Sequence, residues 1–449
     1  MKDINKFFSQ SLRWVGFEAL SYQLLLLGHQ LLLFRITDYK TYGLIGATFS
    51  LLYLFVAIAD FGLEMSISPF FSTIKRSRRL FRKFFITQSL PNILAVAACT
   101  GVFFALSFIF PTLLGLSHIN HSFFLVLAAT ILSEMLKKPL RTAMHLAFLN
   151  KPVAFIEVGT IILYIVSVWG LYFAGFSVSP MLALIPMLVA SWLSVAAMVW
   201  WLYRFSQSLP HETSREPEGL KTRIKKSRSF NALNQMTHLL FSSNFLVPFF
   251  ALQFGLAHAG VFKLVSHVAY CLTSILRKTF GLTSDALLAK TKEMAIHAKR
   301  EVFLRVTQKL HHALYGIIIF FALNYGKIAA YKQVTEKPIP GSVIYLFLII
   351  CLSENLFIAY EKFYITQEKS GHLLIFNVIT MALTYATIQS VIGASELVAL
   401  LSIVAIRIAM FGLLSGFSFY TWKIKPQWKP QPKYLVAALG TAVGFFLFF

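Results

Sequence analysis

A group of charged residues lies within an otherwise apolar stretch of the sequence. Glu134, Lys137, Lys138 and Arg141 all fall inside the hydrophobic segment 121–149. If this segment is a helix, Lys137 and Arg141 share a face because they are four residues apart, and the acid can reach either lysine. Three bases against one acid would leave a surplus positive charge, which suits the binding of an anionic group. An internal set of ion pairs that locks helices together is the alternative interpretation.

Further bases occur in apolar stretches of the second half of the chain. Lys263 and Arg277 lie in segment 259–289, and Arg407 lies deep within segment 395–421. An ionisable side chain inside a membrane span is costly and usually faces a cavity or a partner. We therefore predict a cationic, substrate-binding cavity that is formed by Lys137, Lys138, Arg141, Lys263, Arg277 and Arg407.

Acids in the same kind of segment are candidates for binding a coupling ion. Asp60 lies near the end of segment 42–66, and Glu354 and Glu361, seven residues apart, share a face of segment 341–366. Such carboxylates could bind H+ or Na+ and so shift the equilibrium between two conformations. Internal pairing with the bases is the alternative for each acid.

Several other polar residues interrupt the apolar segments. Glu157 lies in segment 152–175, and Glu18 and His29 lie in segment 12–34. A lone histidine such as His29 or His145 is more typical of a hydrogen-bonded core residue than of a proton relay.

The sequence contains no motif that would supply catalytic chemistry. It has no glycine-rich phosphate-binding loop, no His-Glu-x-x-His motif and no cysteine spacing typical of a metal site. Cys99, Cys271 and Cys351 all lie inside predicted spans, so we interpret them as small apolar residues. We therefore predict no catalytic residue, no metal site, no cofactor and no enzymatic activity.

The elements that must position these residues are long apolar helices. Of the 449 residues, 57% are hydrophobic and only 13% are charged, with a mean hydropathy of +0.69. A bilayer is crossed by about 20 apolar residues. The sequence offers twelve segments of suitable length: 12–34, 42–66, 84–110, 121–149, 152–175, 178–204, 230–252, 259–289, 303–326, 341–366, 371–392 and 395–421.

The net charge of +23 is concentrated in alternate loops between these segments. The loop between the second and third segments carries six bases, from Lys75 to Lys83, whereas residues 111–120 carry none. Because loops rich in Lys and Arg stay in the cytoplasm, this asymmetry places the N-terminus in the cytoplasm. The positive charge is thus explained by topology, and we expect contact with membrane lipids but not with nucleic acid.

The segments divide into two halves. Residues 1–204 form a predicted N-terminal six-helix bundle, 205–229 a cytoplasmic linker and 230–421 a C-terminal six-helix bundle. The remaining residues, 422–449, form a basic segment and a stretch that could be a thirteenth transmembrane helix. The predicted fold class is therefore an all-α polytopic membrane protein in two six-helix halves, which is typical of transporters with internal repeats.

One segment carries a family resemblance. Residues Tyr42 to Glu64 read YGLIGATFSLLYLFVAIADFGLE, which resembles the second helix of polysaccharide and O-antigen flippases. In that family a Tyr-Gly pair opens the helix and an Asp-x-Gly-Leu type of ending closes it. The family belongs to the multidrug/oligosaccharidyl-lipid/polysaccharide exporter (MOP) superfamily. Lipid II flippases of the same superfamily look less similar, because the first segment holds only Arg13 and Arg35, at its ends.

The resemblance implies a fold and a function. The fold would be two six-helix bundles around a central cavity. The function would be that of a flippase in the bacterial cytoplasmic membrane that moves undecaprenyl-pyrophosphate-linked oligosaccharide by alternating access, as a monomer, alongside glycan polymerases and glycosyltransferases. A cationic cavity would offset the desolvation of the pyrophosphate. Two alternatives stay open: a multidrug or small-molecule antiporter of the same superfamily, and a membrane-embedded glycan transferase or ligase. Short outside loops disfavour the last of these.

Overall fold

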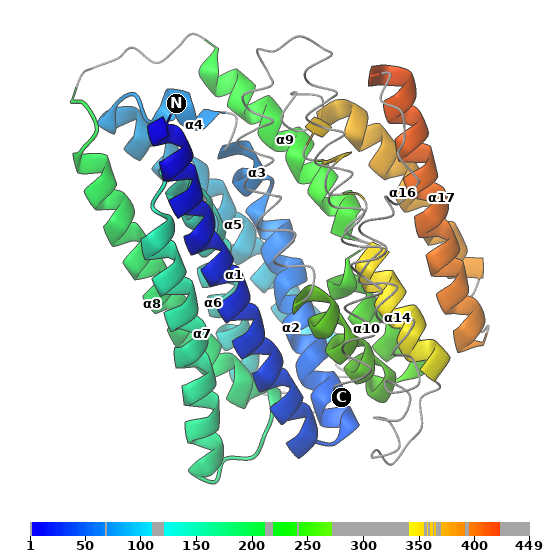
Figure 1. Cartoon of the computed structure of the whole chain (residues 1–449). Helices are drawn as coiled ribbons and strands as arrows, with labels where there is room; N and C mark the ends of the chain where they lie inside the picture. The colour runs from blue at the N-terminus through cyan, green and yellow to red at the C-terminus, as the bar shows by residue number, and fades with distance from the viewer. Residues whose placement is uncertain are drawn as a thin grey trace. The chain divides into compact units, whose positions relative to one another are not determined.

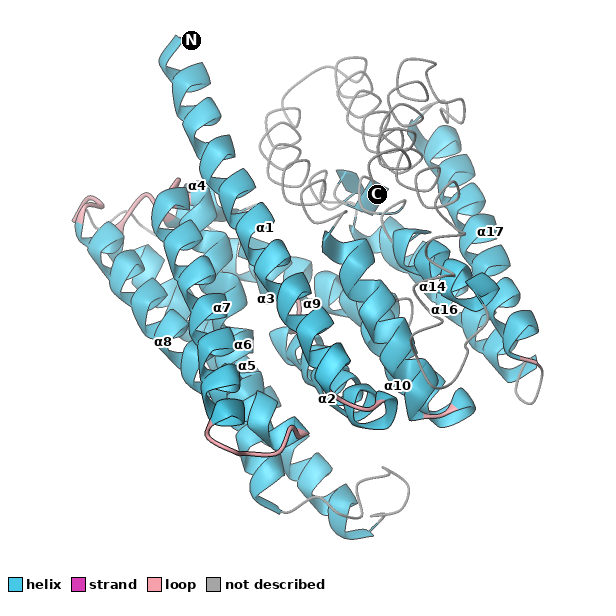
Figure 2. Cartoon of the chain, turned by 60° about the horizontal axis from the view of Figure 1, so that its bottom comes forward, coloured by secondary structure: helices cyan, strands magenta, loops and turns pink. Residues whose placement is uncertain are grey.

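The computed structural model describes residues 2–67, 70–109, 121–211, 219–239, 242–271, 341–353, 357, 360–361, 363–364, 370–390 and 395–422. These ranges contain helices, turns and loops, and no strand (Figures 1 and 2). The chain divides into two compact units, Met1–Leu239 and Leu240–Phe449.

The first unit is a bundle of long helices. They are α1 (Lys2–Ile36), α2 (Tyr39–Asp60), α3 (Leu63–Ile67), α4 (Phe71–Ile74), α5 (Arg78–Ile109), α6 (His121–Leu146), α7 (Asn150–Phe173), α8 (Pro180–Gln207) and α9 (Leu220–Leu239). Helix α1 packs on α7, and α7 packs on α8. The first six predicted segments each coincide with one of these helices, or with the pair α2 and α3. The main differences are that α1 and α5 begin earlier than predicted, in the polar residues before each segment.

The described part of the second unit is also helical. It contains α10 (Ser243–Phe254), a helix over residues 256–271, α14 (Gly341–Ser353), α16 (Ser370–Ser390) and α17 (Glu396–Trp422). Helix α17 packs against both α14 and α16. The predicted ninth segment, 303–326, and the apolar stretch in 422–449 lie outside the described residues, apart from Trp422.

Six helical stretches among the described residues are long and apolar enough to cross a bilayer. They are Arg13–Ile36, Tyr39–Ile67, Arg78–Val102, Asn150–Phe173, Pro180–Gln207 and Leu397–Tyr420. Large apolar side chains on these helices, such as Phe155, Val166 and Leu193, are more than half exposed. Apolar surface on this scale is suited to contact with lipid rather than water.

Helix α6 holds the central place in the packing of the first unit. It contacts α2, α3, α5, α7 and α8. Its apolar residues Ile131 and Met135 pack in one buried cluster with Leu52 of α2 and Leu184 of α8. Helix α6 also carries the four charges recognised in the sequence. Enclosure by five neighbouring helices keeps those charges away from lipid and brings partners within reach.

The junction between α2 and α3 explains the Asp-Phe-Gly-Leu-Glu ending of the flippase-like stretch. Phe61 and Gly62 both have left-handed backbone angles, with φ of 47° and 70°. A Cβ atom at Gly62 would lie 2.5 Å from the backbone nitrogen of Ala232 and 2.6 Å from the carbonyl oxygen of Arg228, both in α9. Only glycine satisfies both the positive φ and the close approach of a second backbone. The motif therefore marks the place where α9 packs against the chain.

We predict that Gly62→Ala destabilises the protein by about 3 kcal/mol, since it combines a left-handed alanine with a backbone clash. Gly175→Ala is a matched control, because Gly175 also has a positive φ, of 91°, but no neighbouring atom within 4 Å of its Cβ position. The control should cost only about 1–2 kcal/mol. Denaturant unfolding in detergent measures both. Equal losses would contradict the close packing of α9 at Gly62.

The boundary between the two units falls after Leu239, whereas the sequence placed the linker at 205–229. The difference comes from α9, which begins at Leu220 and packs against α2 and α3 in the first unit. Asn231 of α9, for example, donates a hydrogen bond of 3.1 Å to the hydroxyl of Ser66. Residues 220–229 of the predicted linker thus form the first half of α9.

Candidate functional site in the first unit

One face of α6 carries four polar side chains. Glu134, Lys137, Arg141 and His145 follow one another at intervals of three or four residues, which places them in a row along the helix. Neighbouring helices bring acids to this row. We call the resulting cluster the ionic ladder, and it consists of Glu134, Lys137, Arg141 and His145 with their acidic partners Glu18 of α1, Glu64 of α3 and Glu157 of α7.

The middle of the ionic ladder is buried. The Nζ atom of Lys137 lies 3.1 Å from Oε2 of Glu157 and 3.8 Å from Oε1 of Glu134. The side chains of Lys137 and Glu157 are only 6% and 3% exposed. Ser191 of α8 donates a short hydrogen bond to Oε1 of Glu134. Lys137 is therefore held between two carboxylates and is out of reach of a bulky substrate.

Arg141 lies at a more accessible part of the ladder. Its guanidinium nitrogens lie 3.9 Å from Oε1 of Glu157 and 4.0 Å from Oε1 of Glu64. These distances are longer than a hydrogen bond. The side chains of Arg141 and Glu64 are 30% and 31% exposed. Arg141 is thus a loosely paired and accessible cation, whereas Lys137 is a tightly paired and buried one.

His145 connects the ladder to α1. Its Nε2 atom lies 3.7 Å from Oε2 of Glu18, a carboxylate that is fully buried. Its Nδ1 atom lies 2.6 Å from Oδ1 of Asn150, so Nδ1–H donates to that oxygen. A ring oriented in this way agrees with the interpretation of His145 as a hydrogen-bonded interior residue.

The charge balance of this cluster corrects the expectation from the sequence. We expected one acid to face three bases near the middle of α6, which would leave a surplus of positive charge. In the structure, the ladder contains four carboxylates against Lys137, Arg141 and a histidine. The expectation failed because acids on other helices, distant in sequence, complete the pairing.

Lys138 and Asp60 lie off the ladder. The side chain of Asp60 is fully buried, and both of its carboxylate oxygens accept the backbone N–H of Glu64 at 3.3 Å. The carboxylate therefore caps the start of α3. Lys138 is near enough to Asp60 for their charges to interact. Asp60 thus has a structural task at the α2–α3 junction, and its predicted role in ion coupling stays a prediction.

The other predicted site residues belong to the second unit. Lys263 is buried. Arg407 is also buried, and its guanidinium donates to the carbonyl of Ile350 and, at 3.0 Å, to the hydroxyl of Ser353. Glu361 is partly exposed. Arg277 and Glu354 lie outside the described residues. The cavity that we predict from all six bases stays a prediction.

The sequence showed Glu18 and Glu157 inside apolar segments and Glu64 at the end of another, and it left internal pairing open without assigning any of these acids to a particular base of α6. It also left Arg228 in a loop, whereas this residue is buried and donates to the carbonyl of Phe61 at 3.2 Å and to the carbonyl of Gln88 at 2.8 Å. For each acid, the feature of the sequence that could have revealed it is an ionisable residue inside an apolar segment.

Among the described residues, no group of three or more His, Cys, Asp or Glu is arranged to hold a metal ion.

The structure resembles solved structures of membrane transporters along most of its length. A eukaryotic MATE transporter matches with a TM-score of 0.63 and 14% identity, covering 97% of this chain and 98% of that chain. A Vibrio cholerae MATE transporter matches with a TM-score of 0.63 and 12% identity, covering 93% and 98%. A MOP superfamily transporter from Pyrococcus furiosus matches with a TM-score of 0.65 and 10% identity, covering 92% and 95%.

These likenesses concern the fold, because all three identities are low. They confirm the predicted fold class, an all-α polytopic membrane protein with two helical bundles. They do not single out the polysaccharide flippases. A scan against protein-family models found no match, and a search of curated proteins found none.

Proposed function

We propose that this chain is an ion-coupled membrane transporter that exports organic solutes by alternating access. The observation that carries the proposal is the ionic ladder, an acid-rich cluster inside an apolar helix bundle. Charged groups at such depth are costly and generally serve transport or proton transfer. A cluster with more carboxylates than permanent cations can take up H+ or Na+.

Ion uptake can drive transport only if it favours one conformation over the other. The ladder is suited to this because it joins four helices. Its side chains come from α1, α3, α6 and α7, and Ser191 adds α8. Neutralising a carboxylate would weaken a contact between helices rather than a contact within one helix. A change of protonation would therefore change how these helices pack.

The fold supports the proposal as well. Solved structures of this fold include proteins described as multidrug resistance MATE transporters, in outward-facing and inward-facing conformations. The Pyrococcus furiosus transporter is described as having a binding pocket of reverse polarity that suggests a different function. Proteins of this fold therefore differ in the charge of their binding pockets, and the fold alone does not determine that charge.

The test is transport by the purified protein in proteoliposomes. We expect a cationic dye to move only when a proton or sodium gradient is imposed, and movement to stop when the gradient is collapsed. Glu64→Gln should change the dependence on the gradient while the protein still folds, because Glu64 is the accessible acid of the ladder. Dye movement that continues without any ion gradient would contradict ion coupling.

A second candidate function is the flipping of lipid-linked oligosaccharide. The observation in its favour is Arg141, an accessible guanidinium suited to a pyrophosphate, together with the flippase-like stretch from Tyr42 to Glu64. The bacterial cytoplasmic membrane, the cytoplasmic N-terminus and the association with glycan polymerases and glycosyltransferases are further proposals. A fluorescent undecaprenyl-pyrophosphate-linked sugar in the same proteoliposomes tests this candidate directly.

A further inference from the structure

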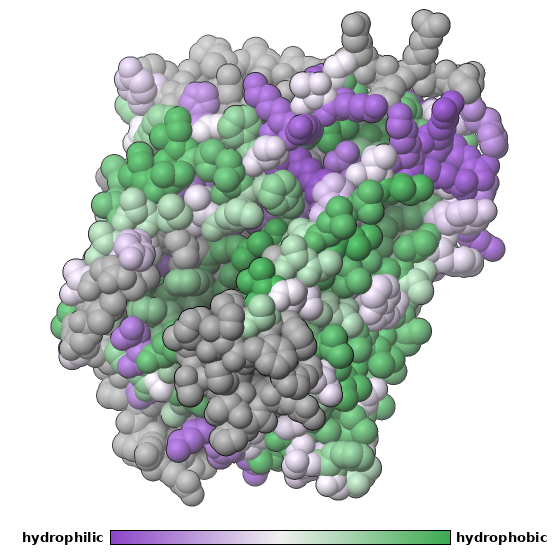
Figure 3. All heavy atoms as spheres, turned by 180° about the vertical axis from the view of Figure 1, so that it is seen from behind, coloured by the Kyte–Doolittle hydropathy of each residue, from purple (hydrophilic) through white to green (hydrophobic). Residues whose placement is uncertain are grey.

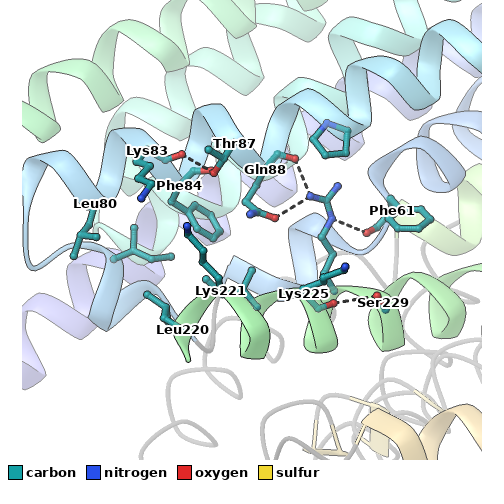
Figure 4. A pocket seen from close by; sticks show the side chains of 14 residues that line it. Phe61, Leu80, Lys83, Phe84, Thr87, Gln88, Leu220, Lys221, Lys225 and Ser229 are labelled. Atoms are coloured by element: carbon teal, nitrogen blue, oxygen red, sulfur yellow. Dashed lines mark hydrogen bonds between the residues drawn. The ribbon is translucent and has the colours of Figure 1, made fainter. Parts of the chain in front are cut away.

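A second polar feature of the first unit lies away from the ionic ladder. It is a cavity of about 460 Å³ between the start of α5 and the first half of α9. Phe61, from the α2–α3 junction, forms one side of it. Figure 4 shows Lys83 of α5 and Lys221 of α9 reaching toward the same space beside Phe84. We call this cavity the α5–α9 pocket.

The charged lining of the α5–α9 pocket is entirely basic. Lys83, Lys221, Lys225 and Arg228 line it, and no acid is among its lining residues. Lys221 and Lys225 are four residues apart on α9, so they project from one face. Both are exposed, and neither forms an ion pair with any described residue. Lys221 and Lys225 therefore bring to the pocket positive charge that the described part of the protein leaves available for an anion.

The side chain of Arg228, one of the four basic lining residues, is held in place by hydrogen bonds. Its guanidinium donates to the carbonyls of Phe61 and Gln88 and to the side-chain oxygen of Gln88 at 2.9 Å (Figure 4). It also donates to Asn92. These bonds join α9 to α5 and to the α2–α3 junction. Arg228 is thus committed to the protein, and Lys221 and Lys225 are the exposed lysines on α9 that can meet a ligand.

Most of the uncharged lining is apolar, and Thr87, Gln88 and Ser229 are its polar members. Phe61, Phe84 and Pro91 contribute from one side, and Leu220 and Ile224 contribute from α9. A free inorganic anion gains no binding energy from apolar side chains, whereas the glycerol and acyl carbons of a lipid would pack against them. The composition therefore favours an amphiphile with a negatively charged head.

The position along α5 also fits a lipid. The apolar span of α5 begins at Arg78, and the exposed residues change from Lys83 to Ile86 and Leu90 within about two helical turns. Hydrophilic side chains gather near the starts of α5 and α9, and apolar side chains lie next to them (Figure 3). The pocket thus lies at the level where lipid head groups meet the hydrocarbon.

We propose that the α5–α9 pocket binds the phosphate of an anionic phospholipid, with Lys221 and Lys225 at the phosphate and the lipid carbons against Phe61 and Phe84. Basic pockets at the cytoplasmic ends of membrane helices are suited to such head groups. The lipid would join α9 to α5 and so hold α9 against Gly62, where the flippase-like stretch ends. This role is independent of which solute the protein transports.

The test uses the purified full chain in neutral detergent. Phosphatidylglycerol, phosphatidylcholine with the same acyl chains, and inorganic phosphate are titrated separately while the unfolding temperature is followed, which yields an apparent Kd for each. We expect saturable stabilisation by phosphatidylglycerol only. Lys225→Gln should weaken its binding about fivefold, as expected for one lysine near an anionic head group.

Lys226→Gln is the matched control, because Lys226 is the next residue of α9, is exposed and loses the same charge, but does not line the pocket. It should leave the Kd unchanged. Equal weakening by both variants would show a non-specific surface effect and overturn the proposal. Stabilisation by inorganic phosphate at the same affinity would also overturn it, in favour of a soluble phosphate site. A photoreactive phosphatidylglycerol should crosslink within residues 80–91 or 220–229, and crosslinks confined to other helices would count against the pocket.

Discussion

Glu157→Gln should destabilise the protein by about 3 kcal/mol and abolish transport. Glu157 is 3% exposed and lies 3.1 Å from Lys137, which is itself buried. Removing one partner of a buried pair leaves the other charge without full compensation, which typically costs about 3–5 kcal/mol. Because Lys137 keeps Glu134 at 3.8 Å, we expect a loss at the lower end of that range. Denaturant unfolding in mixed micelles measures the stability, and a gradient-driven proteoliposome assay measures transport.

Glu64→Gln is the matched control for this stability measurement. It makes the same chemical change on the same ladder, but the Glu64 side chain is 31% exposed and lies 4.0 Å from its cation. Exposed pairs of this kind contribute about 0–1 kcal/mol. If both variants lost the same stability, the distinction between a buried and an accessible part of the ladder would be wrong.

The double variant Lys137→Met with Glu157→Gln separates stability from function. Replacing both members of a buried pair by neutral groups is often close to neutral for stability, so the double variant should recover most of what Glu157→Gln loses. The coupling energy between the two positions should then reach about 2 kcal/mol. Transport should not recover, because the charges that we propose to respond to the ion are gone. Full recovery of transport would show that the pair is purely structural.

The helices of this protein could be predicted from the sequence because each long apolar segment has little choice of structure in a membrane. A segment such as 152–175 must satisfy its backbone hydrogen bonds internally, so it becomes α7, Asn150–Phe173. The row of charges on α6 followed from helical periodicity alone. These predictions needed only local information, and they agree with the structure.

The pairing of the ladder could not be predicted in the same way. Glu18 and His145 are far apart in the sequence, as are Glu64 and Arg141, and nothing local says which helices will be neighbours. Counting the charges within one helix therefore gave the wrong sign for the net charge of the cluster. The role of α9 was missed for a similar reason. Its basic residues are typical of a loop, and its packing depends on Gly62, in the junction between α2 and α3.

Arg141→Gln decides between the two candidate substrates. Among the bases of the ionic ladder, Arg141 is the accessible one, with a side chain that is 30% exposed against 6% for Lys137. If the protein exports organic cations with the ladder as its coupling site, the loss of this cation removes only two long ion pairs. The ion pair between Glu157 and Lys137 would remain. We therefore expect the rate of export to stay within about fivefold of that of the unaltered protein.

The flippase function requires the opposite result. A pyrophosphate would be held by the two parallel donors of the guanidinium, and a lysine cannot reproduce that geometry. Losing such a bond typically costs about 1.5–3 kcal/mol, so Arg141→Gln would reduce flipping of an undecaprenyl-pyrophosphate-linked sugar more than tenfold, and Arg141→Lys would not restore it. We expect the first result, with cation export retained, because carboxylates outnumber permanent cations in the ladder. A tenfold loss of flipping with no cation export in any variant would reverse the order of the two candidates.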